Sequence, residues 1–317
     1  MKLYFSVLLS FFASQCFAQV ENKTYYDKNG RFPKSNDSIY YVQIIRPDTA
    51  SKLFNVQQFY KNGHPKLIGK STSLTSTVFD GNVIEYYNNA KRKIMASYKD
   101  GYKLGSYYEY FPSGKLYIHK EYTPKKDLSD SLNFTIQNVN DTAGVATVVD
   151  GNGIYNIYDE NFSHVTESGP VKNGKRNGEW KGDYKERGIT FVEIYADGEL
   201  MSGEAISMGQ RSSYKKRFIL PVFPGGDVAF GRFLGTHMRY PMIDLQNKVQ
   251  GRVLLTFIIE KDGKVTNLEV LNSLSPTTDK EATKILTASS PWVNAVEFGF
   301  PAKVQYTMPI DFSMRTE

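Results

Sequence analysis

The residues able to carry acid–base or metal chemistry are few and scattered along this chain of 317 residues. The four histidines lie far apart in the sequence and lack the spacing of metal ligands: His64, His119, His164 and His237. The segment that starts at Asp150 begins like a calcium loop, but its twelfth position is Asn161 instead of glutamate, which favours a plain turn. Phosphate-binding, nucleophile-elbow and zinc-protease motifs are absent from the sequence. We therefore expect neither an enzyme, nor a metal site, nor a cofactor.

Backbone hydrogen bonding near the C-terminus is the more informative chemistry. Apolar residues alternate there and predict a strand from Lys303 to Phe312 with one buried face: Val304, Tyr306, Met308, Ile310 and Phe312. Proline has no N–H, so Pro309 is tolerated only where its nitrogen points away from a neighbouring strand. Backbone direction alternates with a period of two, so the amides of Gln305 and Thr307 point to the same open side. Such an edge accepts an added strand; an inert edge protected by Pro309 and Lys303, or pairing in a homodimer, are the alternatives.

The elements that position this strand follow from the pattern of residues after about Leu220. A short helix is expected through Phe230, Phe233 and Leu234, and strict alternation predicts a strand from Gly251 to Glu260. A hairpin turn at 261–264 leads to a second strand over 265–271. The sequence Thr278-Asp279-Lys280-Glu281 fits a capping box that opens a second helix. The order helix–strand–strand–helix–strand predicts a small α+β domain, an antiparallel sheet with two helices.

Residues 20 to about 217 are rich in tyrosine and divided by tight turns. Nineteen of the 22 tyrosines lie between Tyr25 and Tyr214, in short runs that end at Asn-Gly, Asp-Gly or Ser-Gly pairs. Turn residues recur 24 positions apart, at Ala90 and Gly114 and again at Gly174 and Gly198. This period predicts a mostly β region, a meander of hairpins that stack and bury one another's aromatic faces.

The first eighteen residues have the features of a secretory signal peptide. One lysine precedes an apolar run, and Cys16-Phe17-Ala18 supplies small residues at the cleavage positions. The apolar stretch is shorter than the roughly 20 residues needed to span a membrane. An uncleaved membrane anchor and a lipid-modified Cys16 are the alternatives. Cleavage after Ala18 would remove the single cysteine of the chain, which suits an oxidising compartment such as the periplasm.

Composition and charge indicate which kinds of molecule this chain could bind. The chain is 40% hydrophobic, enough to bury real cores, and we interpret Trp180 and Trp292 as core residues. The net charge is +6, and basic residues lie among the aromatics of the repeats, an arrangement that nucleic-acid-binding proteins also use. Because the chain is expected to be exported, we interpret these residues as a solvated outer face and expect no nucleic-acid partner.

The last hundred residues resemble the C-terminal domain of TonB, the periplasmic module of energy transducers. The resemblance covers about residues 219–314 and rests on a series of motifs in order: Phe223-Pro224-Gly225-Gly226, Tyr240-Pro241, Gly251-Arg252-Val253 with Phe257, Asp262-Gly263-Lys264-Val265, Pro291-Trp292 and Pro309-Ile310-Asp311-Phe312. The preceding stretch 150–180 is similar to what precedes this domain in proteins of the Bacteroidetes type, and its Asn173-Gly174 to Trp180 pattern resembles MORN repeats. A proline-rich spacer, usual in energy-coupling members, is absent.

The organisation expected from these observations has five segments: a signal peptide (1–18), MORN-like β repeats (19–122), a linking segment that breaks the array (123–150), further MORN-like repeats (151–217) and the TonB-like domain (219–317). The resemblance implies a periplasmic adaptor that serves TonB-dependent transport across the outer membrane. A proton-driven motor in the inner membrane would be reached only through another subunit. The alternative is a structural or interaction protein of the cell envelope in which the repeats bind and no energy is transduced.

The resemblance also implies where the partner binds. In the TonB family a short extended peptide of the outer-membrane transporter pairs with the last strand of the domain, and the Tyr-Pro segment lies nearby. Carried over to this sequence, the expected partner-binding residues are His237, Arg239, Tyr240, Pro241, Gln305, Tyr306 and Thr307.

Overall fold

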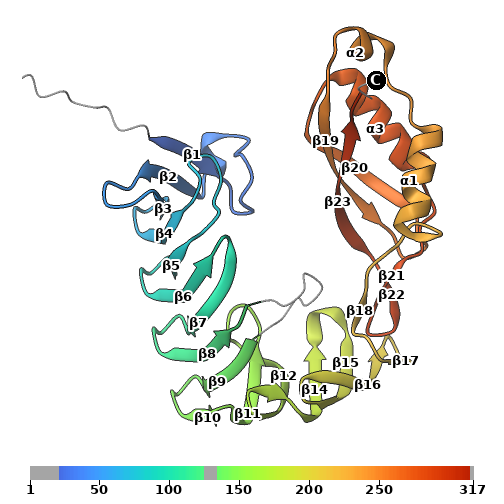
Figure 1. Ribbon diagram of the computed structural model, residues 1–317. Helices are drawn as coiled ribbons and strands as arrows, with labels where there is room; N and C mark the ends of the chain where they lie inside the picture. Colours follow the sequence, from blue (N-terminus) through green and yellow to red (C-terminus); the bar gives the residue numbers. More distant parts are fainter. Residues whose placement is uncertain (1–20, 125–133, 315–317) are drawn as a thin grey trace, which may run out of the picture. The chain divides into compact units, whose positions relative to one another are not determined.

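The computed structural model describes residues 21–124 and 134–314, so the predicted signal peptide (1–18) lies outside the described residues. Figure 1 labels the helices and strands of the chain, which divides into two compact units. The first contains the residues up to Tyr155 together with 171–175, and the second contains 156–170 and the residues from Arg176 onward.

The first unit is an antiparallel meander, in which each strand pairs with the next one along the chain. One short 3-10 turn, Asn36–Ser38, interrupts it. The tyrosine-rich runs, the tight-turn pairs and the period of 24 residues predicted this class of structure. Its strands are β1 (Asn22–Tyr26), β2 (Tyr41–Pro47), β3 (Phe54–Tyr60), β4 (Pro65–Ser71), β5 (Gly81–Tyr86), β6 (Arg92–Lys99), β7 (Tyr102–Tyr110), β8 (Leu116–Tyr122), β9 (Phe134–Asn140), β10 (Ala146–Val149) and β11 (Asn152–Tyr158).

Side chains of one hairpin turn bind the backbone of the next turn, which explains the period of about 24 residues. The Tyr60 hydroxyl donates to the Tyr86 carbonyl at 2.8 Å, and the Tyr87 hydroxyl donates to the Tyr110 carbonyl at 2.7 Å. Lysines repeat the arrangement, because Lys91 Nζ donates to Ser113 O and Lys115 Nζ donates to Ala143 O, both at 2.8 Å. Each turn therefore supplies the donor that satisfies a carbonyl one repeat further on.

The segment 123–150 differs from our expectation. It does not break the array within its described part, because β9 pairs with β8 and β10 pairs with β9. The turn Asp150-Gly151 is a tight turn, as expected, with both residues at positive φ. Its backbone packs directly on the following turn: the Gly174 N–H donates to Gly151 O at 2.9 Å, and a Cβ at Gly151 would lie 2.5 Å from Gly174 N. Glycine is required there because no side chain fits between the two turns.

The second unit contains the last hairpins and the C-terminal domain. Strand β11 crosses the unit boundary, as do β12 (Val165–Lys172) and β13 (Lys175–Arg176). The hairpins continue with β14 (Gly178–Tyr184), β15 (Ile189–Ala196), β16 (Glu199–Ser207) and β17 (Gln210–Tyr214). Then follow β18 (Phe218–Ile219), α1 (Gly226–His237), α2 (Met242–Gln246), β19 (Gly251–Ile259), β20 (Val265–Asn272), α3 (Pro276–Ala288), β21 (Ala295–Glu297), β22 (Phe300–Ala302) and β23 (Val304–Phe312).

The expected fold class is confirmed: a mostly β repeat region and a small α+β C-terminal domain. The main sheet of that domain has the order β20-β19-β23, with antiparallel neighbours. The predicted order of helix, two strands, helix and strand is present. The sequence did not predict the short helix α2 or the second small sheet, β18-β21-β22.

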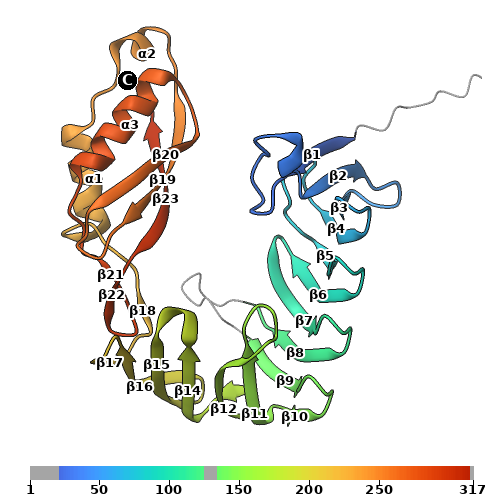
Figure 2. The same cartoon turned by 180° about the vertical axis from the view of Figure 1, so that it is seen from behind.

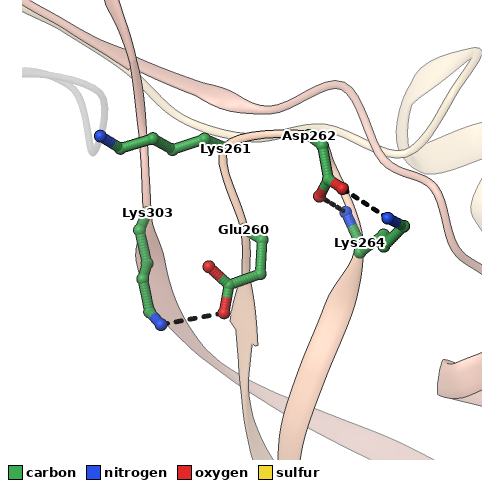
Figure 3. Close-up of a pocket in the computed structure, with 5 residues that line it drawn as sticks. All are labelled: Glu260, Lys261, Asp262, Lys264 and Lys303. Atoms are coloured by element: carbon green, nitrogen blue, oxygen red, sulfur yellow. Dashed lines mark hydrogen bonds and ion pairs between the residues drawn. The ribbon is translucent and has the colours of Figure 1, made fainter.

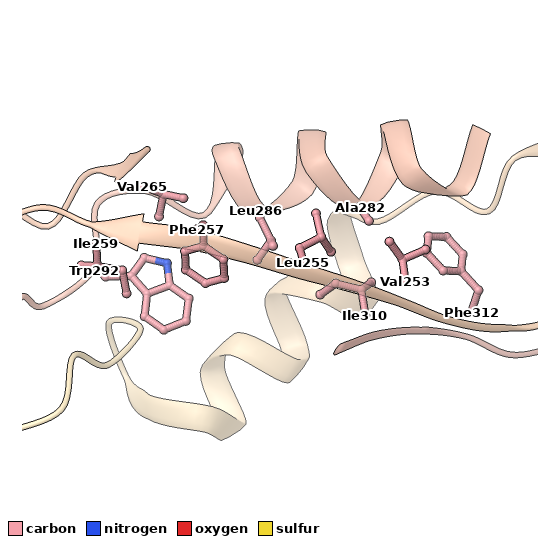
Figure 4. Close-up of a cluster of buried hydrophobic side chains, with 10 residues drawn as sticks. All are labelled: Val253, Leu255, Phe257, Ile259, Val265, Ala282, Leu286, Trp292, Ile310 and Phe312. Atoms are coloured by element: carbon pink, nitrogen blue, oxygen red, sulfur yellow. The ribbon is translucent and has the colours of Figure 1, made fainter. Parts of the chain in front are cut away.

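The core of the C-terminal domain lies between this sheet and the helices (Figure 2). Ala282 and Leu286 of α3 lie against the inward residues of β19, Val253, Leu255 and Phe257, all of them 0% exposed (Figure 4). Phe230 and Leu234 of α1 pack on the same cluster. Both helices therefore cover one face of the sheet, which explains the strict alternation along β19.

The predicted capping box of α3 is displaced by one turn. Ser275 is the N-cap: its hydroxyl accepts from the Thr278 amide at 3.1 Å, and Thr278 Oγ1 accepts from the Ser275 amide at 3.0 Å. Pro276 occupies the first helical position, where a missing N–H costs nothing. The expected partner Glu281 instead accepts a hydrogen bond from the Arg239 amide at 2.8 Å.

Candidate partner-binding edge

Strand β23 forms one edge of the C-terminal sheet. It pairs with β19 through nine consecutive residue pairs without a shift in register, from Gly251 opposite Phe312 to Ile259 opposite Val304. Within residues 21–124 and 134–314, no strand pairs with its other side. A long, regular edge of this kind offers a row of backbone donors and acceptors.

The register indicates which backbone groups face away from β19. Pro309 lies opposite Leu254, and because proline has no N–H, its nitrogen must belong to the outward-facing set. Thr307 and Gln305 share that parity. The alternate residues of β23 direct their backbone groups towards β19. Tyr306 is one of them, because its carbonyl accepts a hydrogen bond from Thr256 Oγ1 of β19 at 3.2 Å. The amides of Thr307 and Gln305 therefore belong to the open side.

The opposite edge of the sheet, β20, is irregular. Its pairing with β19 shifts register twice, between Leu254 and Leu255 and between Thr256 and Ile258. Asn267 of β20 adopts a positive φ of 51°. Bulges of this kind twist a strand and interrupt its row of hydrogen-bonding groups, so they protect an edge against added strands. Of the two edges, only β23 keeps a regular backbone.

Strand β23 is held rigid on both faces. On the inner face, the ring of Trp292 lies among Phe223, Phe230 and Phe257 and 6.2 Å from the ring of Tyr306. On the outer face, Gln305 Nε2 donates to Thr256 Oγ1 at 2.9 Å, and the side chain of Thr256 is itself buried. The strand is therefore preorganised, which lowers the entropic cost of pairing with a further strand.

The Tyr-Pro segment is tied to α3 and to the end of β23. The Arg239 amide is held by Glu281, and the Tyr240 hydroxyl donates to the Val249 carbonyl. The Tyr240 ring packs edge-on against Phe312, with centroids 5.6 Å apart, and burial raises the pKa of Tyr240. His237 ends α1 with its ring stacked on Phe233, 4.6 Å away, and stays exposed.

The expected site residues thus fall into two groups along one strand. Pro241 precedes α2, and Tyr240 lies at the Phe312 end of β23. Gln305 and Thr307 lie five to seven residues earlier, which corresponds to roughly 17–24 Å along a strand. Among the described residues, no hydrogen bond, ion pair or ring contact joins the two groups. Tyr306 differs from its neighbours, since its ring belongs to the core.

Two features that support this edge escaped the sequence analysis. The contact between Glu281 and Arg239 joins residues 42 apart, and no local pattern marks it. The bulges of β20 were missed as well, although Asn267 was a usable signal because asparagine tolerates a positive φ better than most residues.

A charged hollow of about 350 Å³ lies beside the start of β23 (Figure 3). Its charges are mostly paired: Lys303 Nζ lies 2.9 Å from Glu260 Oε1, and Lys264 Nζ lies 2.7 Å from Asp262 Oδ2. Hydrogen bonds from these lysines lower the pKa of both carboxylates. The hollow presents ordinary surface ion pairs and no arrangement of nucleophile and base.

In the part of the chain that the structure describes, no group of three His, Cys, Asp or Glu side chains could hold a metal ion. Over the same residues, none of the helices is both long and apolar enough to cross a membrane.

Comparison with known proteins bears on the C-terminal domain. Residues 236–314 match the family model described as the Gram-negative bacterial TonB protein C-terminal, which confirms the resemblance for these residues. The NMR solution structure of the TonB C-terminal domain of Helicobacter pylori (residues 179–285) matches at 21% identity, over 28% of this chain and 81% of that one, with a TM-score of 0.23. The search of curated proteins returned no match. The likeness of the hairpins to MORN repeats stays a prediction.

Proposed function

We propose that this chain is a TonB-like adaptor of the periplasm, which binds outer-membrane transporters and serves transport across that membrane. The observation that carries the proposal is the contrast between the two edges of the C-terminal sheet: β23 is regular over nine residue pairs, whereas β20 is bulged. The match of residues 236–314 to the TonB C-terminal family supports the same function.

In the proposed complex, an extended peptide of the transporter adds as a strand beside β23. Backbone hydrogen bonds to Gln305 and Thr307 would supply affinity, and side-chain contacts would supply specificity. A peptide that follows the whole edge also reaches the Phe312 end of the strand, where the ring of Tyr240 packs. His237 and Arg239, which contact α1 and α3, stay predicted contacts of the same peptide. Inner-membrane energy would reach this chain through another subunit.

The substitution Thr307→Pro tests this site in the full-length chain. It removes an amide that belongs to the open edge while leaving the ladder to β19 intact, as Pro309 already does two residues further on. We expect the affinity for synthetic peptides that copy the periplasmic N-terminal segments of transporters from the same genome to fall at least tenfold, measured by isothermal titration calorimetry.

The matched control is Thr307→Ala, which keeps the amide and loses only the side chain. Its affinity should stay within about threefold of the original protein. Circular dichroism and tryptophan fluorescence establish that both variants are folded. Equal affinity of a folded Thr307→Pro variant and the original chain would contradict strand addition at this edge. If none of the peptides binds to the original chain, the structural role of the repeats becomes the better explanation.

A further inference from the structure

A residue of the C-terminal domain completes the core of the last repeats. Phe298, in the turn between β21 and β22, is only 1% exposed and belongs to a cluster formed by Ile189, Phe191, Ala205 and Tyr214 of β15, β16 and β17. Its ring stacks on that of Phe191, with centroids 4.8 Å apart, and meets the ring of Tyr214 edge-on at 5.9 Å. The cluster would contain a hole without it.

The backbone of this turn, like the ring of Phe298, is in direct contact with the repeats. The Phe298 amide donates to the Arg217 carbonyl at 2.8 Å, and Ser212 Oγ donates to the Gly299 carbonyl at 3.1 Å. Gly299 has a positive φ of 76°, and a Cβ there would lie 2.1 Å from Ser212 Oγ. Only glycine fits this approach.

Charged groups surround the inserted ring. The guanidinium of Arg217 lies 5.2 Å from the Phe298 ring and 4.7 Å from the Phe191 ring, a cation–π arrangement. The same guanidinium binds the buried carboxylates of Glu167 and Glu193. At the rim, Arg187 makes a two-point contact with Glu297, with Nη1 3.0 Å from Oε1.

The chain on either side of the hairpin, before β21 and after β22, leads into the C-terminal domain. Trp292, at the centre of that core, lies three residues before β21, and its amide donates to the Gly263 carbonyl at 2.8 Å. On the other side, only Lys303 separates β22 from the edge strand β23. The hairpin is therefore covalently continuous with the proposed partner-binding strand and is packed into the repeats.

We propose that the β21–β22 hairpin is an anchor that fixes the C-terminal sheet to the hairpins β14–β17. Residues 219–317 are then not an independent module, because their domain contributes Phe298 to the core of the last repeats. Given the proposed function, a pull on β23 by a bound peptide passes through β22 and Phe298 into the repeat sheet. The hairpins β14–β17 thereby provide the attachment point for the edge strand.

Limited trypsin digestion of the full-length chain with Phe298→Ala tests the anchor. Lys215 and Lys216 are exposed, and they lie between β17 and β18, next to Arg217, which the anchor holds. Release of the hairpin should raise the rate of cleavage after these lysines at least tenfold. The control is Phe218→Ala, an exposed phenylalanine of β18 close to the same bonds, for which the rate should change less than twofold. The affinity of Phe298→Ala for the peptides should be unchanged, so failure of the anchor is distinguishable from failure of the binding site.

Hydrogen exchange of the original protein gives a second measurement that needs no variant. If the anchor exists, the Phe298 amide exchanges within tenfold of the rate of the central amides of β15. Exchange of that amide at the rate of an exposed loop would overturn the proposal. So would unchanged cleavage of Phe298→Ala, or an equal increase in the cleavage of Phe218→Ala.

Discussion

The two hydrophobic cores of the second unit are covered in different ways, one by helices and the other by long polar side chains. In the C-terminal domain, helices α1 and α3 lie over the sheet, and the buried cluster is made of apolar side chains such as Leu255, Phe257 and Leu286. In the last repeats, no α-helix covers β14–β17 within the described residues, and only a short 3-10 helix (Lys185–Arg187) joins β14 to β15. There, long polar side chains cover the sheet, and among its buried residues are the carboxylates Glu167 and Glu193.

The difference teaches how a sheet without a second layer excludes water. Glu193 is 0% exposed and accepts hydrogen bonds from the Tyr195 and Tyr214 hydroxyls, both at 2.9 Å, and from Arg217 Nε at 3.0 Å. Glu167 is bound by Arg176, Arg217 and the Tyr184 hydroxyl. Both of these buried carboxylates thus have charged and hydrogen-bonding partners, as low-dielectric surroundings require. The long side chains of arginine and tyrosine serve both as apolar cover and as donors.

The largest effect should follow the loss of Glu193. Glu193→Ala leaves Arg217 with half of its charge partners and leaves two tyrosine hydroxyls without their acceptor, which costs about 3–5 kcal/mol of unfolding free energy. Urea unfolding measures this, and the only two tryptophans separate the cores: Trp180 reports the repeats and Trp292 the C-terminal domain.

The control for Glu193→Ala is Glu204→Ala, a carboxylate of the neighbouring strand whose side chain is 60% exposed and pairs with Arg211. It should change stability by less than about 0.5 kcal/mol. A loss for Glu193→Ala no larger than this would show that the polar cover contributes nothing and would remove the contrast between the cores.

The second expected effect is a dependence of the stability of the last repeats on pH. Burial would raise the pKa of Glu167, but hydrogen bonds from Arg217 and the charge of Arg176 outweigh it and hold the pKa at about 2. Because the folded pKa lies below the unfolded value, the carboxylate stabilises the fold above about pH 4.5, and this stabilisation is lost as the pH falls towards 2. The loss amounts to about 3 kcal/mol.

Urea titrations at pH 7, 4 and 2.5 check this prediction, with Trp180 as the probe in a Trp292→Phe background. Glu167→Gln should be less stable than the original protein at pH 7. Between pH 4 and 2.5 its unfolding free energy should fall much less than that of the original protein. If stability at the Trp180 probe falls equally in the two proteins, other carboxylates are responsible for the acid sensitivity.

Sequence patterns predicted the parts of this structure that depend on neighbours along the chain. The alternation in β19 and β23 and the turns at Asp150, Asn173 and Asp197 follow from residue types within a few positions. The buried network was missed because its central residue, Arg217, lies 24 residues from Glu193 and 50 residues from Glu167. One signal was available: in β15 the buried positions Ile189 and Phe191 are followed, two residues on, by a glutamate.

The candidate site was predictable to a similar extent. The register of β23 follows from the period of two and from Pro309, and both are visible in the sequence. The insertion of Phe298 was not predictable, because a single apolar residue in a short loop has many potential partners. The position of Tyr240 at the Phe312 end of the strand depends on the tertiary path of α1 and α2, which no local pattern specifies.

The smallest effect concerns α3, the helical cover of the C-terminal core. Ser275→Ala removes the hydroxyl that accepts from the Thr278 amide and should cost about 1 kcal/mol. Urea unfolding detected through Trp292, in a Trp180→Phe background, measures it.

The comparison variant is Thr277→Ala in the first turn of the same helix: it keeps the cap but removes the hydroxyl that donates to the buried Asp244, so it loosens α2 instead. If the cap assigned from the sequence were correct, Ser275→Ala would be neutral and Glu281→Ala would fray the helix. In the observed arrangement, Glu281→Ala frees the Arg239 amide and loosens the Tyr-Pro segment while the first turn of α3 stays formed.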